Sequence, residues 1–161
     1  MTIDSDDFRR TLGCFATGIT VITTVDEDGA PVGLTANSFT SLSLDPPMVL
    51  FCLDRNVQSF EAFHHNRHFA VNILCEDQRE VSTRFARSGI EKWSGMEFDT
   101  WETGCPILRG CLANLECDID TIHEGGDHVI ITGEVRRVER DGDSDRPLLY
   151  FRGGYAALNG G

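Results

Sequence analysis

Residues 18–53 read GITVITTVDEDGAPVGLTANSFTSLSLDPPMVLFCL, and this stretch carries the main indications of the fold. It contains three β-rich runs, GITVITTV, PVGLTANSF and PPMVLFCL. The first two flank an Asp-Gly step within DEDGAP, a sequence typical of a β-hairpin. Pro46 and Pro47 fix the start of the third run, whose apolar composition predicts a short buried strand.

Short helices are predicted at three places outside this stretch. Asp4 or Ser5 can cap the first, whose apolar residues fall on one side. The second is expected over residues 56–64, with two phenylalanines facing inward. The third covers residues 77–87, and the Ser-Gly step that follows them ends it.

Further strands are predicted from HFAVNIL, CLANLECDIDTI, DHVIITGEVRRVER and RPLLYFRG. In CLANLECDIDTI, polar residues alternate with apolar ones, which indicates a half-buried antiparallel strand. The chain lacks the βαβα rhythm of a doubly wound sheet. We therefore expect a mainly β protein with short helices, folded as a small closed antiparallel barrel with helices packed on its ends.

Length and composition are those of one ordinary domain. The chain has 161 residues, of which 40% are hydrophobic and 25% charged, enough to bury a core without disulfides. We expect one domain over residues 1–161, with its core over about residues 8–158. The six cysteines show no CxxC spacing, which disfavours zinc ribbons and redox pairs and favours buried thiols in a reducing compartment.

Charge and hydropathy exclude several classes of partner. The net charge of −12 disfavours binding to nucleic acid or to an anionic membrane surface. No apolar run approaches the roughly 20 residues of a membrane-spanning helix. The N-terminal sequence MTIDSDDFRR lacks the basic and apolar segments of a secretory signal. A cytoplasmic location is therefore expected. Lys92 is the only lysine, so arginines supply nearly all fixed positive charge.

Missing motifs narrow the chemistry. The sequence has no GxGxxG after its first strand, no GxxxxGK[ST] and no GxSxG, which argues against Rossmann, P-loop and serine-hydrolase sites. His64, His65 and His68 include two imidazoles four residues apart, a spacing that can bind zinc on a helix. Asn66 and Arg67 should end that helix, and no third ligand is evident. We expect no metal site.

The segment GLTANSFTSLSLDPP, residues 33–47, is the strongest candidate for a binding loop. Its hydroxyl and amide side chains surround one phenylalanine and directly precede a buried strand. One interpretation is a polar loop that leads into a barrel strand. The other is a loop whose backbone and side chains hydrogen-bond the polar edge of a flat heterocycle.

Two further segments could contact a phosphorylated ligand. In LDRNVQSF, Asp54 and Asn56 could cap a helix whose first amides, with Ser59, take a phosphate. Arg84 or Arg87 of RFARSG could pair with that phosphate.

In GGDHVIITGEV, two glycines precede Asp127 and His128. They let a ligand approach the backbone closely. A lone histidine there is usually structural, but its place beside Asp127 in a Gly-Gly turn favours a ligand contact.

The order of these segments resembles the flavin reductase-like family, the short-chain NAD(P)H:flavin oxidoreductases of two-component flavin monooxygenases. The resemblance covers residues 8–158, and its most specific parts are TANSFTSLSLDPP and the GDH of residues 126–128. It implies an FMN-binding split barrel, antiparallel and Greek-key-like. It also implies a homodimer, with non-covalent FMN or FAD near the subunit boundary and NADH or NADPH as reductant.

The resemblance also implies a set of contacts. His128 and Tyr155 would border the nicotinamide, and no side chain is expected to act as general acid or base, because the cofactors carry the hydride chemistry. The cofactor-binding residues that it implies are Thr35, Ala36, Asn37, Ser38, Phe39, Ser41, Cys52, Asp54, Asn56, Ser59, Phe85, Ala86, Arg87, Asp127, His128 and Tyr155.

Two alternatives to a flavin reductase remain at this point. One is a ferric or cob(III)alamin reductase on the same scaffold, with a different electron acceptor. The other is a split-barrel protein that binds flavin or haem without turnover. A pyridoxamine-phosphate oxidase is disfavoured, because its extended basic phosphate motif has no match here.

Overall fold

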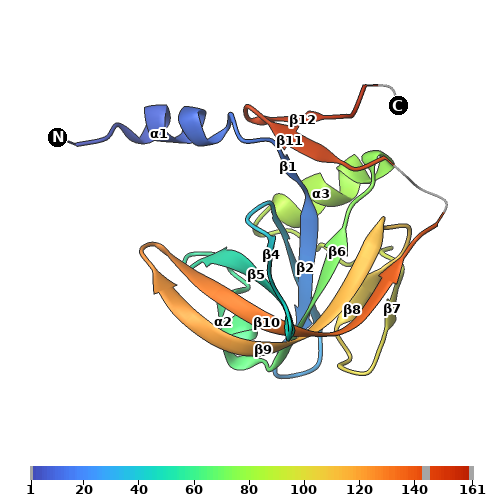
Figure 1. Ribbon diagram of the computed structural model, residues 1–161. Helices are drawn as coiled ribbons and strands as arrows, with labels where there is room; N and C mark the ends of the chain where they lie inside the picture. Colours follow the sequence, from blue (N-terminus) through green and yellow to red (C-terminus); the bar gives the residue numbers. More distant parts are fainter. Residues whose placement is uncertain (1, 143–145, 160–161) are drawn as a thin grey trace.

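A seven-stranded antiparallel sheet, with strand order β3-β2-β6-β9-β10-β5-β4, forms the body of the molecule (Figure 1). The computed structural model describes residues 2–142 and 146–159. Two small sheets accompany the large one, β1-β11-β12 and β7-β8. The elements in chain order are α1 (Ser5–Leu12), β1 (Thr17–Gly18), β2 (Thr20–Val25), β3 (Pro31–Ala36), β4 (Thr40–Leu44), β5 (Pro47–Asp54), α2 (Phe60–His65), β6 (His68–Ile73), the 3-10 helix η1 (Glu76–Gln78), α3 (Arg79–Ala86), β7 (Phe98–Thr100), β8 (Pro106–Leu108), β9 (Ala113–Gly125), β10 (His128–Arg140), β11 (Leu149–Phe151) and β12 (Gly154–Ala156).

The β2–β3 hairpin confirms the prediction from the Asp-Gly step. The Asp26 carboxylate accepts hydrogen bonds from the amides of Asp28 (3.0 Å) and Ala30 (2.8 Å). Gly29 adopts a φ of +79°, a left-handed conformation that glycine reaches without steric cost. The hairpin register then pairs Thr20 with Ala36 and Val25 with Pro31.

The main core lies inside the curved sheet and is closed at one end by α2. Phe51 packs edge-to-face on Phe63 of α2 and on Phe69 of β6, with ring centroids 5.8 and 5.1 Å apart. Offset and edge-to-face contacts are the favoured geometry between aromatic rings. All three rings are fully buried, so α2 is fixed at that end of the sheet.

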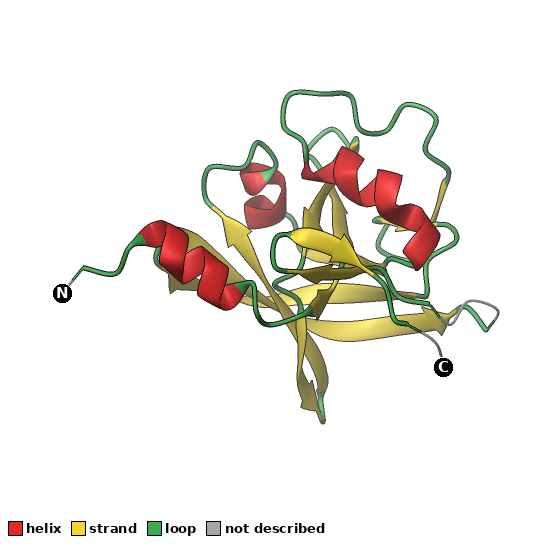
Figure 2. Ribbon diagram, turned by 90° about the horizontal axis from the view of Figure 1, so that it is seen from above, coloured by secondary structure: helices red, strands yellow, loops and turns green. Residues whose placement is uncertain are grey.

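A second core lies on the outer face of β2 and β3, where α3 packs. Val21, Phe85 and Leu108 are buried there, with Trp93 and Tyr155 at its margin. Figures 1 and 2 show α3 against the sheet and next to the β11–β12 hairpin.

The sheet is mainly antiparallel as predicted, but it is not closed, so the expected closed barrel is wrong. β3 and β4 are its two edges. Because strand directions alternate across the sheet, both edges run the same way, and the chain passes from one to the other through residues 37–39 without reversing. Ser38 holds this passage to β5: its Oγ accepts from the Cys52 amide (3.1 Å) and donates to the Cys52 carbonyl (3.0 Å).

Two local predictions need correction. The second helix begins at Phe60 and not at residue 56, because Asp54 Oδ1 accepts from the Asn56 amide (2.8 Å) in a turn of its own. The alternation expected in β9 also fails, since Glu116 is fully buried beside Cys117. The backbone amide and hydroxyl of Thr103 both donate to Glu116 Oε1, at 2.8 and 2.6 Å.

The helix predicted near the N-terminus is confirmed as α1, with Asp4 as its cap. The helix predicted over 77–87 is confirmed as α3, led in by η1. In the described part of the chain, every helix is too short and too polar to cross a membrane.

Candidate functional site

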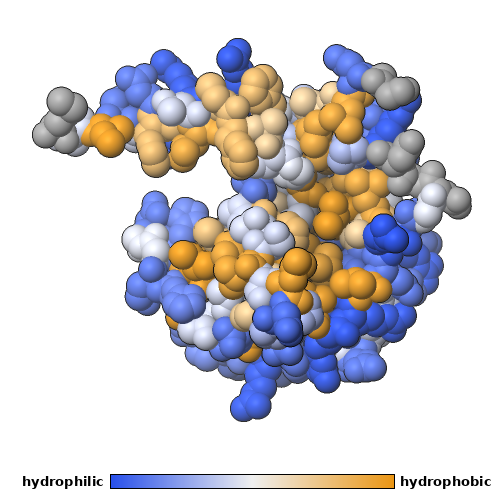
Figure 3. Space-filling view, viewed as in Figure 1, coloured by the Kyte–Doolittle hydropathy of each residue, from blue (hydrophilic) through white to orange (hydrophobic). Residues whose placement is uncertain are grey.

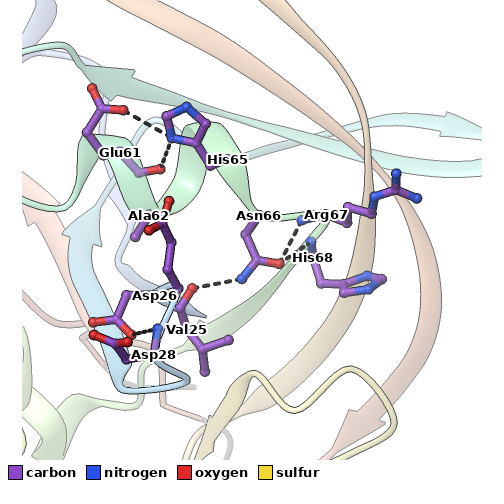
Figure 4. A pocket seen from close by; sticks show the side chains of 10 residues that line it. Val25, Asp26, Asp28, Glu61, Ala62, His65, Asn66, Arg67 and His68 are labelled. Atoms are coloured by element: carbon purple, nitrogen blue, oxygen red, sulfur yellow. Dashed lines mark hydrogen bonds and ion pairs between the residues drawn. The ribbon is translucent and has the colours of Figure 1, made fainter.

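A hollow of about 650 Å³ lies between the β2–β3 turn and the end of α2 (Figure 4). Asn66 joins its two walls by donating to the Val25 carbonyl (2.7 Å). Its carboxylates outnumber its cationic groups, because Asp26, Glu27, Asp28 and Glu61 face one arginine and two histidines. A phosphorylated ligand is therefore disfavoured here.

Of the three histidines singled out in the sequence, His65 and His68 line this hollow, but the three do not share a common contact. His65 Nδ1 contacts the Glu61 carbonyl (3.0 Å) and carboxylate (3.1 Å), whereas His68 Nδ1 contacts Asp118 (2.7 Å) across the sheet. His64 stacks on the ring of Phe60. Within residues 2–142 and 146–159, no group of three metal-ligating side chains is found.

A second cavity, about 450 Å³, lies beside α3 and is here named the α3 cavity. β3 supplies Gly33 and Thr35, the segment before α2 supplies Val57 and Ser59, and Phe85 and Ala86 come from the end of α3. The opposite wall is formed by residues 88 and 90–93. Its lining mixes hydroxyl, aromatic and apolar groups with four charged side chains, those of Asp26, Glu61, Glu91 and Lys92.

A smaller cavity of about 260 Å³ adjoins it and is here named the tyrosine cavity. Both cavities are lined by Thr35 and Ala86, so the two adjoin at these residues. The remaining lining residues of the tyrosine cavity are Ile19, Asn37, Ser82, Tyr150 and Tyr155.

Hydrogen bonds fix the walls where the two cavities meet. Thr35 Oγ1 donates to the Ser82 carbonyl (2.6 Å), which ties β3 to α3. The Ser82 hydroxyl contacts the Tyr155 hydroxyl (2.8 Å), and Thr83 contacts the same oxygen (3.2 Å). A site carried on packed elements in this way is held in one geometry before a ligand arrives.

A second group of predicted residues gathers at the end of the β5–β10 ladder. His128 lies opposite Asp54 in the register, and both project from the outer face, because their neighbours Val129 and Leu53 are buried in the core. His128 Nδ1 lies 2.7 Å from Asp127 Oδ1. This hydrogen bond from His128 lowers the pKa of Asp127. The pair orients the imidazole at the start of β10.

The predicted site residues therefore form two groups in one chain, joined by residues 37–39. The α3 group contains Thr35, Asn37, Ser59, Phe85, Ala86 and Tyr155. The ladder group contains Ser38, Cys52, Asp54, Asn56, Asp127 and His128.

Four predicted residues lie outside these groups. The Ala36 side chain is buried in the main core and Phe39 packs against it, so Ala36 can offer a ligand only its backbone. Ser41 is exposed on β4. Arg87 lines another cavity, of about 480 Å³, with Arg79 and Arg84. It does not line the α3 cavity that Ser59 lines, although Ile90 lines both.

Several residues that line the α3 and tyrosine cavities were not expected from the sequence, and among them are Ser82, Lys92, Trp93 and Tyr150. Trp93 packs edge-to-face on Phe85, with centroids 4.9 Å apart. The one available signal was that Lys92 is the sole lysine of an acidic chain.

Fold and cavities together define an antiparallel β protein of the open-barrel type, with two adjoining cavities beside α3. The model of the family described as "Flavin reductase like domain" matches residues 12–159. The chain belongs to this family.

Named relatives support the same assignment. The chain is 43% identical over 157 residues to the flavin-dependent monooxygenase reductase subunit HsaB of Mycobacterium tuberculosis, covering 97% of this chain and 83% of the relative. It superposes with a TM-score of 0.93 on nitrilotriacetate monooxygenase component B from Mycobacterium thermoresistibile, at 43% identity and over 97% and 87% of the two chains.

A third comparison bears on cofactors. The NADH:FAD oxidoreductase SgcE6 of Streptomyces globisporus, solved in complex with NAD and FAD fragments, is 34% identical with a TM-score of 0.90. The similarity covers 99% of this chain and 97% of that one.

Proposed function

We propose that this protein is an NAD(P)H:flavin oxidoreductase that reduces FMN or FAD and supplies the reduced flavin to a partner flavin-dependent monooxygenase. The observation that carries the proposal is the pair of adjoining cavities at α3, which are lined by Thr35 of TANSF and Ala86 of RFA. These are the segments on which the family resemblance rests.

The residues present fit a flavin. Thr35, Asn37, Ser82 and Tyr155 offer hydroxyl and amide groups, while the partly buried Trp93 offers apolar surface for a ring system. When bound, the flavin accepts a hydride from the nicotinamide. The task of the chain is to bind and orient both partners, with the reacting atoms about 3–3.5 Å apart.

We assign the two groups of side chains to two parts of this task. The α3 group, with Ser38, Cys52 and Asn56 of the ladder group, would hold the flavin. His128, oriented by Asp127, would position the nicotinamide. No side chain is given the role of general acid or base.

We further propose that the protein is a homodimer. α1 projects from the body, and Figure 3 shows apolar surface on α1 and on the part of the body that faces it, with a hollow between them. Exposed apolar patches of this kind mark association surfaces. The large hydrophobic residues exposed on α1, after it and on β4 are Phe8, Leu12, Phe15, Leu42 and Leu44.

Two broader expectations belong with this proposal. The continuous seven-stranded sheet, with α2 and α3 packed on it, supports one domain over residues 1–161.

All six cysteines are free, as expected for a protein of the reducing cytoplasm.

A steady-state assay tests the proposed function. Purified protein is mixed in air with FMN, FAD or riboflavin and with NADH or NADPH, and loss of the reduced nicotinamide is followed. At least one pair should be turned over in proportion to protein concentration. If no pair exceeds the rate without protein, the chain is a binding protein and not a reductase.

A further inference from the structure

The turn that carries His128 is not held in place by burial. Residues 123–127 are all exposed, and the turn contains two glycines, of which Gly126 adopts a φ of +77°. Glycine leaves the backbone more conformational freedom than any other residue. The ladder between β5 and β10 ends at the pair of Asp54 and His128, so β5 does not extend over the turn. The direction of the imidazole therefore depends on contacts of another kind.

Arg55, the first residue after β5, contacts both ends of this turn. Its backbone amide donates to the Asp127 carbonyl (3.1 Å). Its guanidinium forms an ion pair with the Glu124 carboxylate. Glu124 precedes the two glycines and Asp127 follows them. A single residue outside the hairpin therefore holds the turn on both sides of its glycines.

The charges at this end of the ladder increase the importance of the Arg55 side chain. Asp54, Glu124 and Asp127 place three carboxylates here, and like charges repel each other. Arg55 supplies a permanent positive charge among them. It pairs with Glu124, while Asp127 pairs with His128. Without the guanidinium, the two acids that flank the glycines would favour a more open turn.

The ion pair is too exposed to contribute much to the stability of the whole fold. The Glu124 side chain is 84% exposed and the Arg55 side chain 35%, and exposed ion pairs stabilise proteins only slightly. The strands that lead into the turn are fixed by the ladders of β9, β10 and β5. Local effects of Arg55 on the turn can therefore be measured separately from effects on global stability.

We propose that Arg55 is a positioning residue for flavin reduction, because through Glu124 it fixes the turn of residues 124–128 and keeps the His128 imidazole directed at the nicotinamide. The inference rests on the proposed function, in which His128 contacts the nicotinamide, and it names the residue on which that orientation depends. Arg55 acts through the turn and does not bind the nucleotide itself. Its backbone bond to Asp127 does not require a particular side chain, so the pair with Glu124 is the part that substitution removes.

Hydrogen exchange tests the conformational part without any ligand. Arg55→Gln and Glu124→Gln each remove one partner of the pair, and amide exchange over residues 122–130, corrected for intrinsic rates, is followed by mass spectrometry. Exchange should rise about two- to fivefold in both variants, the range of an exposed ion pair. Glu139→Gln is the matched control, because it removes an exposed pair with Arg137 near the other end of β10, and it should leave the turn unchanged. Unchanged exchange in both Arg55→Gln and Glu124→Gln would overturn the inference.

Nucleotide binding tests the functional part. Arg55→Gln should weaken binding of NAD(P)⁺ to flavin-loaded protein, and raise KM for NAD(P)H, by about two- to fivefold. Flavin affinity and melting temperature should stay nearly unchanged. The charge exchange Arg55→Glu with Glu124→Arg should restore most of the nucleotide affinity, because it remakes the pair. Unchanged affinity in Arg55→Gln would contradict the proposal. A charge exchange that restores nothing would mean that Arg55 binds the nucleotide directly, and the inference would be wrong.

A double-mutant cycle with His128 separates positioning from direct contact. In a His128→Ala background, Arg55→Gln should have no further effect on nucleotide binding, because the group that it positions is gone. An equal loss in both backgrounds would contradict the inference. If the wild-type protein binds no nicotinamide nucleotide, the proposed function fails together with this assignment. Normal turnover beside unchanged exchange of the turn makes the assignment of Arg55 alone wrong.

Discussion

At the scale of single residues, His128 is the group whose structural and functional roles can be separated most cleanly. It is half-buried at the start of β10, and its side chain forms a hydrogen bond with the exposed Asp127. Little packing energy depends on a side chain in such a position. Removal of the imidazole should therefore weaken ligand binding and leave the stability of the fold nearly unchanged.

We predict that His128→Ala raises KM for NAD(P)H and slows hydride transfer, while flavin affinity and melting temperature stay nearly unchanged. The reason is that the lost contact exists only when nicotinamide is present. Steady-state kinetics and thermal melting of one preparation supply both readouts.

Asp127→Asn is the matched control for this prediction. It leaves the imidazole in place and weakens only its orientation, so its effect on KM should be smaller. A fall in stability of about 1–3 kcal/mol for His128→Ala, with flavin binding lost in parallel, would instead mark a structural histidine.

The sequence signals that single out His128 and Thr35 are local. His128 follows two glycines, and Thr35 lies among hydroxyl and amide side chains, although the structure places it on β3 and not in a loop. Glu116 and Lys92 have no such local signal. Glu116 accepts a hydrogen bond from the Thr103 amide, and Lys92 donates one to the carbonyl of Gly33, which lies 59 positions away in sequence. Long-range contacts of this kind leave no periodicity to detect.

At the scale of elements, the packing of α3 against β3 depends on the absence of a Cβ atom at Gly33. A Cβ at this position would lie 2.8 Å from Phe85 Cε1 and 3.1 Å from Trp93 Cζ2. Both rings are packed in the second core, so neither can move aside freely. Any side chain here pushes α3 away from the sheet and alters the α3 cavity.

We predict that Gly33→Ala destabilises the protein by about 1–3 kcal/mol, the usual cost of overpacking, and weakens flavin binding as well. Chemical denaturation and flavin titration provide the two measurements. Gly18→Ala in β1 is the matched control, because its Cβ would meet no atom within 4 Å. A Gly33→Ala protein as stable as the Gly18→Ala protein would contradict this description of the α3 contact.

Strands and hairpins were predictable from sequence, and helix boundaries less so. The β-branched run of β2 and the turn around Gly29 specify a hairpin by local chemistry alone. The start of α2 was misplaced, since Asp54 and Asn56 suit either a helix cap or a separate turn. The hydrogen bond between them, at 2.8 Å, shows that the turn forms.

At the scale of the whole molecule, the open edge of the sheet and the projecting α1 leave apolar surface without a partner. β4 forms one edge, and Leu44 on it is 95% exposed, while Phe15 beyond α1 is 79% exposed. We expected a closed barrel. Strand patterns in a sequence do not show whether the two edge strands of a sheet pair with each other, so the sequence could not reveal that the sheet stays open. In fact the chain itself crosses between them at residues 37–39.

We predict a dimer in solution that Leu44→Asp weakens, because a buried unpaired carboxylate at an apolar contact is costly. Sedimentation should shift from twice toward once the chain mass of 17.9 kDa. Val138→Asp on β10, also at an exposed apolar residue, should leave the dimer intact. An active wild-type protein that sediments as a monomer would exclude the dimer.

The central claim is that the chain transfers a hydride from NAD(P)H to flavin, and anaerobic mixing tests it most directly. Catalytic protein is added to NADH or NADPH with excess FMN or FAD, and both absorbances are followed without oxygen. Oxidised flavin should disappear one for one with reduced nicotinamide, at a rate proportional to protein. If flavin stays oxidised, or if only a ferric chelate or cob(III)alamin is reduced in its place, the proposed function is contradicted.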